Sequence, residues 1–513
     1  MSVNYSPITG VWEITMGCNM RCKHCGSSCE SPLEGELTTE EALRLCDDIA
    51  GLGFKWITLS GGEPTTRKDW DIIAKRLNDN GVIPNMITNG WLMNGAIAKR
   101  AKTAGVNTVA LSLDGLKNTH DYIRKEGSYD KIMSAIDVLT ENGLNCSVIT
   151  TINNINIKEL YEIHDILSQK NIFGWQLQLG LPMGNMSKNS ELVTQPHHID
   201  EVIDFAYNAM NKGGIEIQLA DCIGYFNKKE IEIRRKAREG SVYSWNGCAA
   251  GKYGLGILHN GDVVGCTSIR NKDFIEGNIR EIPLKALWNN PENFSWNRNM
   301  TKDKLSGICQ KCLFGSRCLG GCGNTKLTIG KSVYSENIYC SYNHTIKKAE
   351  AQFERLSDIQ PMLEKAKKFA ENNSYQLAEL LLSRILLTEP ENEEVLKLYG
   401  YVSFMLENYR QALEANERLI RKHPSDPYIN KGYGLSIAKL GDADKGIQYL
   451  QKAIELSDKQ YLDPFNDLAV ILCENGRYGE ALSVLENGRS ISKDFRQESE
   501  SLYQMLKKQM NYI

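Results

Sequence analysis

The chain has 513 residues, of which 24% are charged, and its formal net charge at pH 7 is −3. This near-balance gives no electrostatic reason to expect a nucleic-acid partner, and no basic stretch is long enough to suggest one. The N-terminus lacks the charged and apolar regions of a signal peptide, and no run approaches the roughly 20 apolar residues of a membrane span. We therefore expect a cytoplasmic protein with no membrane segment, built from roughly two to four domains.

Residues 10 to about 220 alternate strand-like apolar runs with helical patterns. The strand-like runs are Val11–Thr15, Trp56–Ser60, Val82–Thr88, Thr108–Leu113, Cys146–Ile152, Gly174–Leu179 and Ile215–Leu219. The helical patterns are Thr39–Gly51, Lys68–Asn80, Asn94–Ala104, Tyr129–Asn142 and Ile157–Gln169. Thr38 and Glu41 have the spacing of a capping box at the first helix. Such alternation predicts a parallel sheet with helices outside it. Six units favour an α/β partial (β/α)6 barrel over residues 1–220, with its chemistry at the C-terminal strand ends.

The fifteen cysteines are unevenly distributed. Four lie in residues 18–29 and seven in residues 248–340, while Cys46, Cys146, Cys222 and Cys473 are scattered. A disulfide framework suits short secreted chains, so clustering at ligand-like spacings predicts metal centres in a reducing compartment. Residues 221–345 are also rich in Gly and Asn, with a hairpin signal at 255–264. This composition predicts that residues 221–345 form a small Cys-rich α+β domain that bound metal stabilises.

From about residue 359 the pattern is entirely helical and repeats every 34 residues. Small residues recur in each repeat at two positions: Ala366, Gly400, Gly434 and Ala469, and then Ala378, Ala412, Gly446 and Ala481. Pro390 and Pro424 close the first two units, the third has Asp458 instead, and the fourth is offset by one residue. The pattern resembles tetratricopeptide (TPR) repeats. It predicts an all-α TPR solenoid over residues 359–513, with about four repeats and a terminal helix at Phe495–Asn511; a plain helical appendage is the alternative.

Cys18, Cys22 and Cys25 follow the first predicted strand with the spacing C-x3-C-x2-C. Four-iron clusters are normally held by four cysteine thiolates, so a three-cysteine loop leaves one iron open to another ligand. A zinc knuckle is the alternative, although its ligands usually come as two separated pairs. A second motif, Ser60-Gly61-Gly62-Glu63-Pro64, follows the second predicted strand. Its glycines let backbone approach a ligand, and its carboxylate can accept a hydrogen bond from an ammonium group.

These two motifs resemble those of the radical S-adenosylmethionine (SAM) superfamily. The resemblance implies that Cys18, Cys22 and Cys25 hold a [4Fe-4S] cluster whose open iron binds SAM, and that Gly61, Gly62 and Glu63 bind its amino group. It also implies an oxygen-sensitive enzyme that reductively cleaves SAM to a 5′-deoxyadenosyl radical, supplied with electrons by a flavodoxin- or ferredoxin-type donor.

Further SAM contacts are implied more weakly at the ends of later strands. Asn89 follows the third strand, and Ser112 and Asp114 follow the fourth, where they would face the methionine carboxylate or ribose; serine and aspartate are otherwise common turn residues. Arg124 would pair with the SAM carboxylate or lie solvated on the surface. Asn153, after the fifth strand, is a further candidate.

The later cysteines read Cys248-x17-Cys266, then Cys309-x2-Cys312-x5-Cys318-x3-Cys322, then Cys340. This order resembles the SPASM extension, which holds two auxiliary [4Fe-4S] clusters and brings the total to three. By resemblance, Cys248, Cys266 and Cys322 bind auxiliary cluster I, and Cys309, Cys312, Cys318 and Cys340 bind auxiliary cluster II. A pair of zinc ribbons is the alternative, but seven ligands is one short of two tetrahedral sites.

Auxiliary cluster I lacks a fourth cysteine in this sequence. Either one iron is open, or another residue reaches it; Cys222 is the candidate, against an inert buried thiol. Cys29 has no assigned role, and no catalytic acid or base is predicted.

The leading functional hypothesis is a maturase for a ribosomally made peptide (a RiPP), forming a thioether or carbon–carbon crosslink or oxidising a side chain. Only about ten residues precede the first strand, which leaves no small leader-binding domain there, so the repeats would dock the precursor peptide. The alternatives are a sulfatase-type protein maturase and a small-molecule radical SAM oxidase with repeats serving assembly. The last alternative is a non-catalytic iron–sulfur and TPR scaffold. The intact cysteine triad and the intact glycine motif argue against a scaffold.

Overall fold

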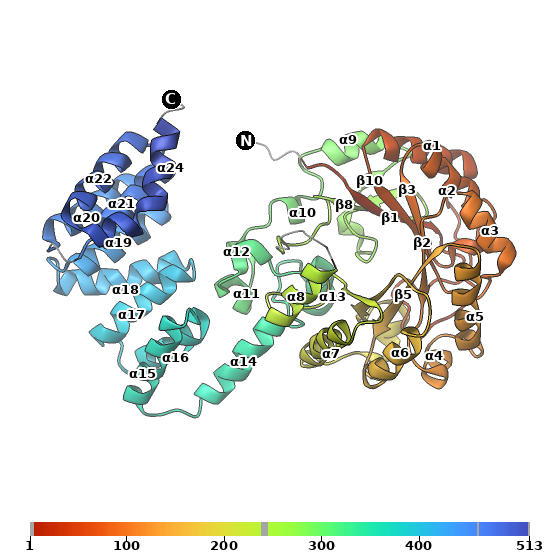
Figure 1. The fold of residues 1–513 in the computed structure, drawn as a ribbon, viewed down its shortest axis with the longest axis horizontal. Coiled ribbons are helices and arrows are strands. Elements are labelled where there is room, and N and C mark those ends of the chain that lie inside the picture. Colours follow the sequence, from red (N-terminus) through yellow and green to blue (C-terminus); the bar gives the residue numbers. More distant parts are fainter. Residues whose placement is uncertain (1–4, 238–244, 459–460, 511–513) are drawn as a thin grey trace. The chain divides into compact units, whose positions relative to one another are not determined.

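The computed structural model describes residues 5–237, 245–458 and 461–510. The chain divides into two compact units, Met1–Gln310 with Phe314–Thr345, and Lys311–Leu313 with Ile346–Ile513. Figure 1 labels the elements of both units.

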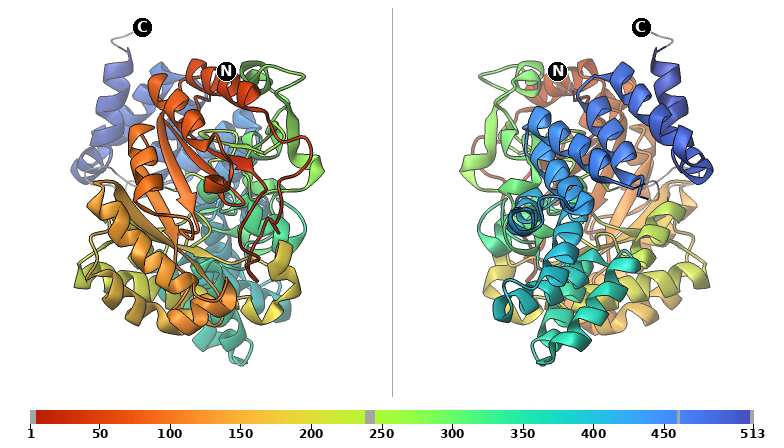
Figure 2. Two further views of the ribbon diagram at one scale, coloured as in Figure 1. Left: turned by 90° about the vertical axis from the view of Figure 1, so that its right-hand side faces the viewer. Right: turned by 90° about the vertical axis from the view of Figure 1, so that its left-hand side faces the viewer.

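The first unit contains a parallel sheet whose strands follow one another in chain order. Its strands are β1 (Thr9–Thr15), β2 (Trp56–Gly61), β3 (Ile83–Thr88), β4 (Thr108–Ser112), β5 (Asn145–Ile152), β6 (Gly174–Leu179) and β7 (Glu216–Leu219). Each pairs in parallel with the next, as the alternation of strand and helix predicts. Figure 2 shows the sheet curving inside a layer of helices. The fold is therefore the expected partial barrel.

Helices connect these strands on the outer face of the sheet (Figure 1). They are α1 (Thr39–Gly51), α2 (Trp70–Asp79), α3 (Gly95–Thr103), α4 (Lys117–Ile123), α5 (Ser128–Glu141), α6 (Leu160–Leu167) and α7 (His198–Lys212). Helix α8 (Lys228–Lys236) follows β7 and packs against α7. The predicted capping box at Thr38 and Glu41 is present. Helix α4 was not predicted, because seven residues are too few to show a helical period; it matters because it places His120 and Arg124.

A hairpin from the Cys-rich region extends the same sheet beyond β1. Strand β8 (Gly254–Ile257) pairs in parallel with β1, and β9 (Asp262–Val264) and β10 (Ile275–Asn278) continue antiparallel. The hairpin predicted at 255–264 is thus confirmed, but its pairing with the barrel was not foreseen. The order β10-β9-β8-β1 through β7 makes the Cys-rich region an extension of the barrel wall.

The rest of the Cys-rich region is made of short helices and turns. Those helices are α9 (Leu284–Asn289), α10 (Ser295–Arg298), α11 (Gly307–Lys311), α12 (Gly315–Cys318), α13 (Gly323–Gly330) and α14 (Ser341–Phe353). None of the fifteen cysteines, all within the described residues, forms a disulfide. The described helices include none long and apolar enough to cross a membrane.

The second unit is all helical. Its helices are α15 (Ile359–Glu371), α16 (Tyr375–Thr388), α17 (Glu393–Met405), α18 (Tyr409–Lys422), α19 (Pro427–Lys439), α20 (Ala443–Leu456), α21 (Asp463–Glu474), α22 (Tyr478–Ile491), α23 (Lys493–Glu498) and α24 (Glu500–Met510). Helices α15, α17 and α19 begin at intervals of 34 residues, as the sequence period predicts. Where α19 and α20 pack, a Cβ on Gly434 would lie 2.8 Å from the Gly446 carbonyl oxygen, so the small residues set the helix separation.

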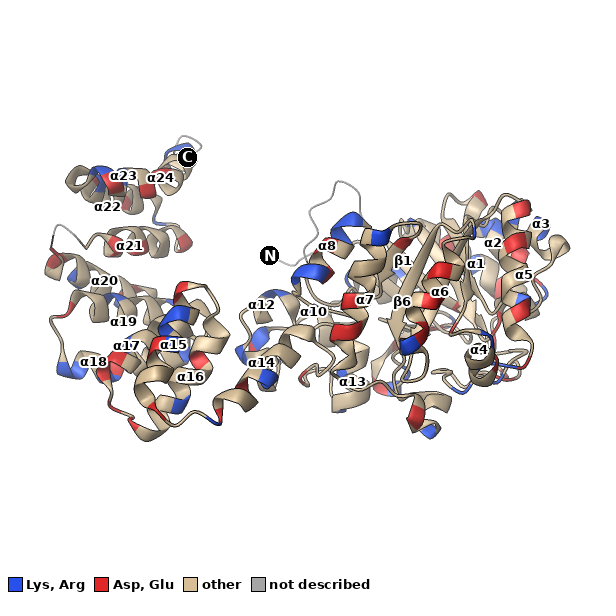
Figure 3. Ribbon diagram, turned by 60° about the horizontal axis from the view of Figure 1, so that its bottom comes forward, with Lys and Arg blue, Asp and Glu red and all other residues tan. Residues whose placement is uncertain are grey.

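The predicted terminal helix is instead two helices, α23 and α24, separated at Ser499. The Ser499 hydroxyl donates to the Phe495 carbonyl (2.6 Å), a back-bond of the kind that bends helices. Asn511, the predicted end, lies outside the described residues. Figure 3 shows acidic and basic residues interspersed along helices such as α5, consistent with the near-balanced charge of the chain.

Candidate active site

A cavity of about 630 Å³ lies at the C-terminal ends of the barrel strands. Alternate strand residues face it, including Val11 and Glu13 on β1, Thr58 and Ser60 on β2, and Gln176 and Gln178 on β6. The intervening residues, such as Trp12, Leu59 and Leu177, are fully buried in the core. This period-two alternation gives the cavity a wall of mixed polar and apolar side chains, backed by a rigid hydrophobic layer.

Cys18, Cys22 and Cys25 all line this cavity, on the loop that follows β1. Burial raises the pKa of Cys22 to about 11, so its thiolate form requires a positive partner such as a metal. Cys29 is also buried beside Cys25 and lines the same cavity.

The two glycines after β2 allow their loop to lie directly against the cysteine loop. The Gly62 amide donates to the Thr15 carbonyl and the Glu63 amide to the Gly17 carbonyl, both at 2.8 Å. A Cβ on Gly62 would lie 2.2 Å from the Gly17 carbonyl oxygen, which no side chain can tolerate. The glycine motif therefore fixes the position of the cysteine loop.

Glu63 is fully buried, and its carboxylate is turned toward neighbouring loops. It accepts hydrogen bonds from the Thr88 hydroxyl and the Asn89 amide (both 2.7 Å) and from Thr65. Burial raises the pKa of Glu63, and these hydrogen bonds offset the shift only in part. Glu63 thus ties the loops after β2 and β3 together.

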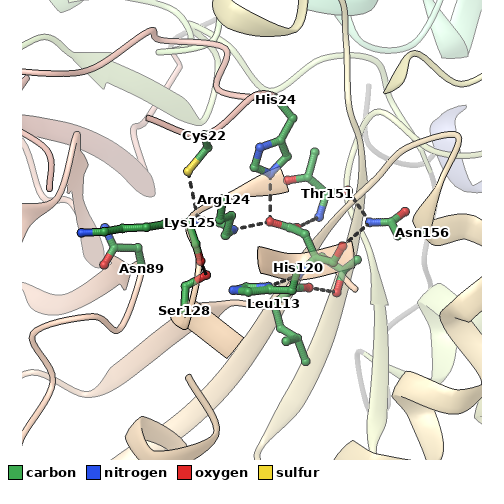
Figure 4. Close-up of polar contacts among 12 residues, drawn as sticks. Cys22, His24, Asn89, Leu113, His120, Arg124, Lys125, Ser128, Thr151 and Asn156 are labelled. Atoms are coloured by element: carbon green, nitrogen blue, oxygen red, sulfur yellow. Dashed lines mark hydrogen bonds and ion pairs between the residues drawn. The ribbon is translucent and has the colours of Figure 1, made fainter. Parts of the chain in front are cut away.

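Arg124, at the end of α4, lines the cavity and forms an ion pair with Asp114. Figure 4 shows the Arg124 side chain near those of His24 and Thr151. The fully buried Asp114 carboxylate accepts from Arg124 Nε (2.5 Å), pairs with His24 Nε2 (2.8 Å) and accepts from the Thr151 amide (2.7 Å). Burial alone would raise the pKa of Asp114, but Arg124 and His24 outweigh it and hold the pKa well below its usual range. Arg124 is therefore a fixed cation in the cavity wall.

The other predicted SAM contacts divide into two groups. Asn89 and Ser112 line the cavity, whereas Asp114 and Asn153 do not. Asn153 is fully buried, and its side-chain oxygen accepts from the amides of Ile155 (3.0 Å) and Asn156 (3.1 Å) to shape the loop after β5.

Three cysteines from later in the chain line the same cavity: Cys222, Cys266 and Cys322. Burial raises the pKa of Cys266, and the nearby Cys248 raises it further. Burial and then the nearby Cys322 raise the pKa of Cys248 in the same way. Of the predicted auxiliary cluster II cysteines, Cys309 and Cys318 are buried on α11 and α12.

The spacing of the sulfurs distinguishes between a cluster and a single ion. Zn–S bonds are about 2.3 Å, so the sulfurs of a tetrahedral zinc site lie about 3.8 Å apart. Among the described residues, the only three potential ligands with atoms within 4.8 Å of one another are His197, His198 and Glu201, on the surface. The cysteines are spread more widely than zinc requires. Thiolates are the usual ligands of iron–sulfur clusters, so the donor set itself fits such a cluster.

Sequence reasoning missed an ion pair within the cavity. Arg270 contacts the carboxylate of Glu13 and the hydroxyl of Ser27, although Glu13 lies 257 residues away. The second Glu13 carboxylate oxygen is buried and has no hydrogen-bond partner among the described residues. Glu13, the one charged residue of β1, was the available signal, but nothing local pointed to Arg270.

Comparisons with known proteins define the class. A model of the radical SAM superfamily matches residues 12–167, and a model of the SPASM iron–sulfur cluster-binding domain matches residues 248–313. The Fe-coproporphyrin III synthase of Methanosarcina barkeri is 30% identical over 291 residues, covering 54% of this chain and 72% of that protein. This chain belongs to the radical SAM superfamily.

Other relatives cover about two thirds of the chain. The AdoMet-dependent heme synthase of Methanosarcina barkeri is 28% identical over 67% of this chain and 98% of that protein. Mycofactocin maturase MftC of Mycobacterium tuberculosis is 24% identical over 66% of this chain and 84% of that protein. Streptococcus suis SuiB bound to S-adenosylmethionine shares the fold, with a TM-score of 0.54 and 16% identity over 65% of this chain and 77% of that one. The protein is a radical SAM enzyme whose cofactors are SAM and [4Fe-4S] clusters.

Proposed function

We propose that this enzyme uses radical SAM chemistry to oxidise a peptide substrate inside the barrel cavity. One observation carries the proposal: the N-terminal cysteine triad and three later cysteines, Cys222, Cys266 and Cys322, line one cavity. When bound, SAM and the clusters supply a 5′-deoxyadenosyl radical and sites for electrons. A substrate in this cavity would lie between the source of the radical and an electron acceptor.

The chain's own residues would position SAM. Cys18, Cys22 and Cys25 hold the cluster, and Gly61 and Gly62, which line the cavity, receive the amino end of SAM. Glu63 lies buried behind them and would act by holding their loop against the loop after β3. Arg124 offers a preorganised cation to the SAM carboxylate, because its ion pair with Asp114 holds the guanidinium in place. Asn89 and Ser112 are the remaining polar contacts, and Asn153 acts by shaping its loop.

The later cysteines would hold auxiliary clusters. Cys248, Cys266 and Cys322 bind cluster I, and Cys309, Cys312, Cys318 and Cys340 bind cluster II. A two-electron oxidation releases one electron and one proton beyond the hydrogen atom taken by the radical, and a cluster held by these cysteines would supply a site for that electron. A flavodoxin- or ferredoxin-type donor reduces the first cluster, which fits a reducing, cytoplasmic compartment.

A precursor peptide is the preferred substrate class. Mycofactocin maturase MftC is a sequence relative, and the fold is shared with SuiB, which has been captured with its precursor peptide SuiA. In this chain the TPR-like helices of residues 359–513 would dock the peptide. Sulfatase-type maturation of a folded protein is the alternative within this class.

A second candidate, a haem-type tetrapyrrole, is favoured by a different observation. Several relatives of 26–30% identity are named haem or coproporphyrin synthases. The sequence resemblance alone carries this candidate.

Assaying the full chain with a peptide and with an iron porphyrin separates the two candidates, and deleting residues 359–513 tests the docking role. With a peptide substrate, the truncated enzyme keeps reductant-dependent SAM cleavage but loses peptide turnover by at least tenfold at low peptide concentration. Unchanged peptide turnover would reject the docking role, and turnover of an iron porphyrin in place of any peptide would reject the peptide class.

A further inference from the structure

Auxiliary cluster I has three assigned cysteines, and a fourth faces the same space. Cys222 lies on the loop after β7 and lines the cavity together with Cys266 and Cys322. We propose that Cys222 is the fourth ligand of auxiliary cluster I, so that this cluster has no open iron. The inference rests on the proposed function only in assigning an auxiliary cluster to Cys248, Cys266 and Cys322.

A buried tyrosine ties the Cys222 loop to the Cys322 loop. The Tyr225 hydroxyl donates to the Asp221 carbonyl (2.6 Å) and accepts from the Cys322 amide (2.9 Å). A Cβ on Gly321 would lie 2.4 Å from the Tyr225 ring, so glycine is needed for the ring to pack there. One side chain thereby fixes the residues next to both cysteines relative to each other.

Arg234 braces the same loop from behind. Its guanidinium, 5% exposed, donates to the carbonyls of Leu219 (2.8 Å), Ala220 (3.1 Å) and Ile223 (2.7 Å). The backbone on both sides of Cys222 is thus held by one buried cation, which Glu230 neutralises. These contacts would hold Cys222 in a fixed position, and a metal ligand needs such support from the residues around it.

The loop also contains strained backbone. Tyr225 and Phe226 have φ of 101° and 57°, in the left-handed region that bulky residues avoid. Such strain persists only where surrounding contacts impose it, and it concentrates at functional sites. Here it lets the chain turn sharply after Cys222, so that Tyr225 reaches the Cys322 amide.

The environment of Cys222 differs from that of the inert thiols. Cys46 and Cys146 are buried in the hydrophobic core, and their Sγ atoms donate to backbone carbonyls. Cys222 Sγ instead accepts from the Leu179 amide (3.3 Å), a bond that favours a thiolate and recurs at iron–sulfur ligands. A fully ligated cluster would serve as an electron carrier and would not bind substrate at iron.

The test uses the full chain with Cys18, Cys22 and Cys25 replaced by alanine, reconstituted anaerobically, so that only auxiliary clusters remain. Iron, sulfide and the electron paramagnetic resonance (EPR) spectrum of the reduced protein are measured with and without cyanide, an external iron ligand. We expect cyanide to leave the spectrum of this background unchanged. Adding Cys222→Ala should either make the spectrum cyanide-sensitive or remove about four iron atoms per chain. Adding Cys146→Ala should do neither.

Two results would overturn the inference. One is a cyanide-sensitive spectrum while Cys222 is present, which is decisive even where Cys222→Ala fails to fold. The other is a Cys222→Ala protein with the iron content and cyanide response of the Cys146→Ala control. A background protein that holds no iron would reject the auxiliary clusters altogether. SAM cleavage plays no part in these readouts, so failure of the radical chemistry is recognised separately.

Discussion

Asp114 shows how a residue at a strand end can matter without touching a ligand. Its fully buried carboxylate contacts Arg124, His24 and the Thr151 amide at once. An aspartate placed there by sequence motif alone suggests direct contact with SAM. The structure assigns it instead to holding the cation that faces the cavity.

Replacing Asp114 with asparagine should destabilise the first unit by about 3 kcal/mol or more, because it leaves Arg124 as an unpaired buried cation. All eight tryptophans lie between residues 12 and 296, so tryptophan fluorescence during urea unfolding reports on this unit alone. Asp130→Asn is the matched control. Its exposed pair with Lys117 should contribute only about 0–1 kcal/mol. Equal effects of the two substitutions would refute the positioning role of Asp114.

Gly62 is constrained by its approach to the cysteine loop. We expect Gly62→Ala to displace that loop, since the added Cβ would meet the Gly17 carbonyl oxygen at 2.2 Å. The variant should lose about four iron atoms per chain on reconstitution and should lose SAM binding, as followed by iron analysis and equilibrium dialysis. Gly95→Ala, where a Cβ meets nothing within 4 Å, should keep both. Retention of iron and SAM binding by Gly62→Ala would contradict this account.

At the scale of elements, local patterns predict most of the fold. The capping box of α1 and the period-two strands need only neighbouring residues, so the sequence reveals them. The 34-residue period likewise predicts the helix spacing from α15 to α19. Contacts that join distant segments leave no such trace. The pairing of β8 with β1, the Glu13–Arg270 ion pair and the short α4 depend on tertiary packing, so they appear only in the structure.

Helix α16 carries a buried glutamate whose titration should affect the stability of the helical unit. Glu379 is 7% exposed, and burial raises its pKa despite the nearby Lys311. The Glu379 carboxyl therefore binds its proton more tightly in the folded state than in the unfolded state. The free energy of unfolding of the helical unit falls as the pH rises through the folded-state pKa of Glu379. Glu379→Gln should slow hydrogen exchange in α16 at pH 8, and its advantage should shrink toward pH 5.

The comparison is made at each pH between variant and wild-type full-length protein, which cancels the intrinsic pH dependence of exchange. Glu414→Gln, at an exposed position of α18, is the control and should change little at either pH. A Glu379→Gln protein that exchanges faster than wild type at pH 8 would show that the glutamate charge is stabilising.

At the scale of the whole molecule, the chain combines a barrel that carries the cysteines with a helical unit of different construction. The barrel and the Cys-rich region match the radical SAM and SPASM family models, and these matches end at residue 313, before the helical repeats. The chemistry is therefore defined by the first unit. Under the proposed function, the helical unit would dock the peptide substrate.

The most direct test of the central claim is 5′-deoxyadenosine formation by the anaerobically reconstituted full chain with SAM and a strong reductant. We predict 5′-deoxyadenosine and methionine in equal amounts. Replacing Cys18, Cys22 and Cys25 with alanine should abolish both, whereas Cys46→Ala, a core thiol away from the cavity, should retain SAM cleavage. Absence of 5′-deoxyadenosine from the iron-loaded protein, or its persistence without the triad, would contradict the account.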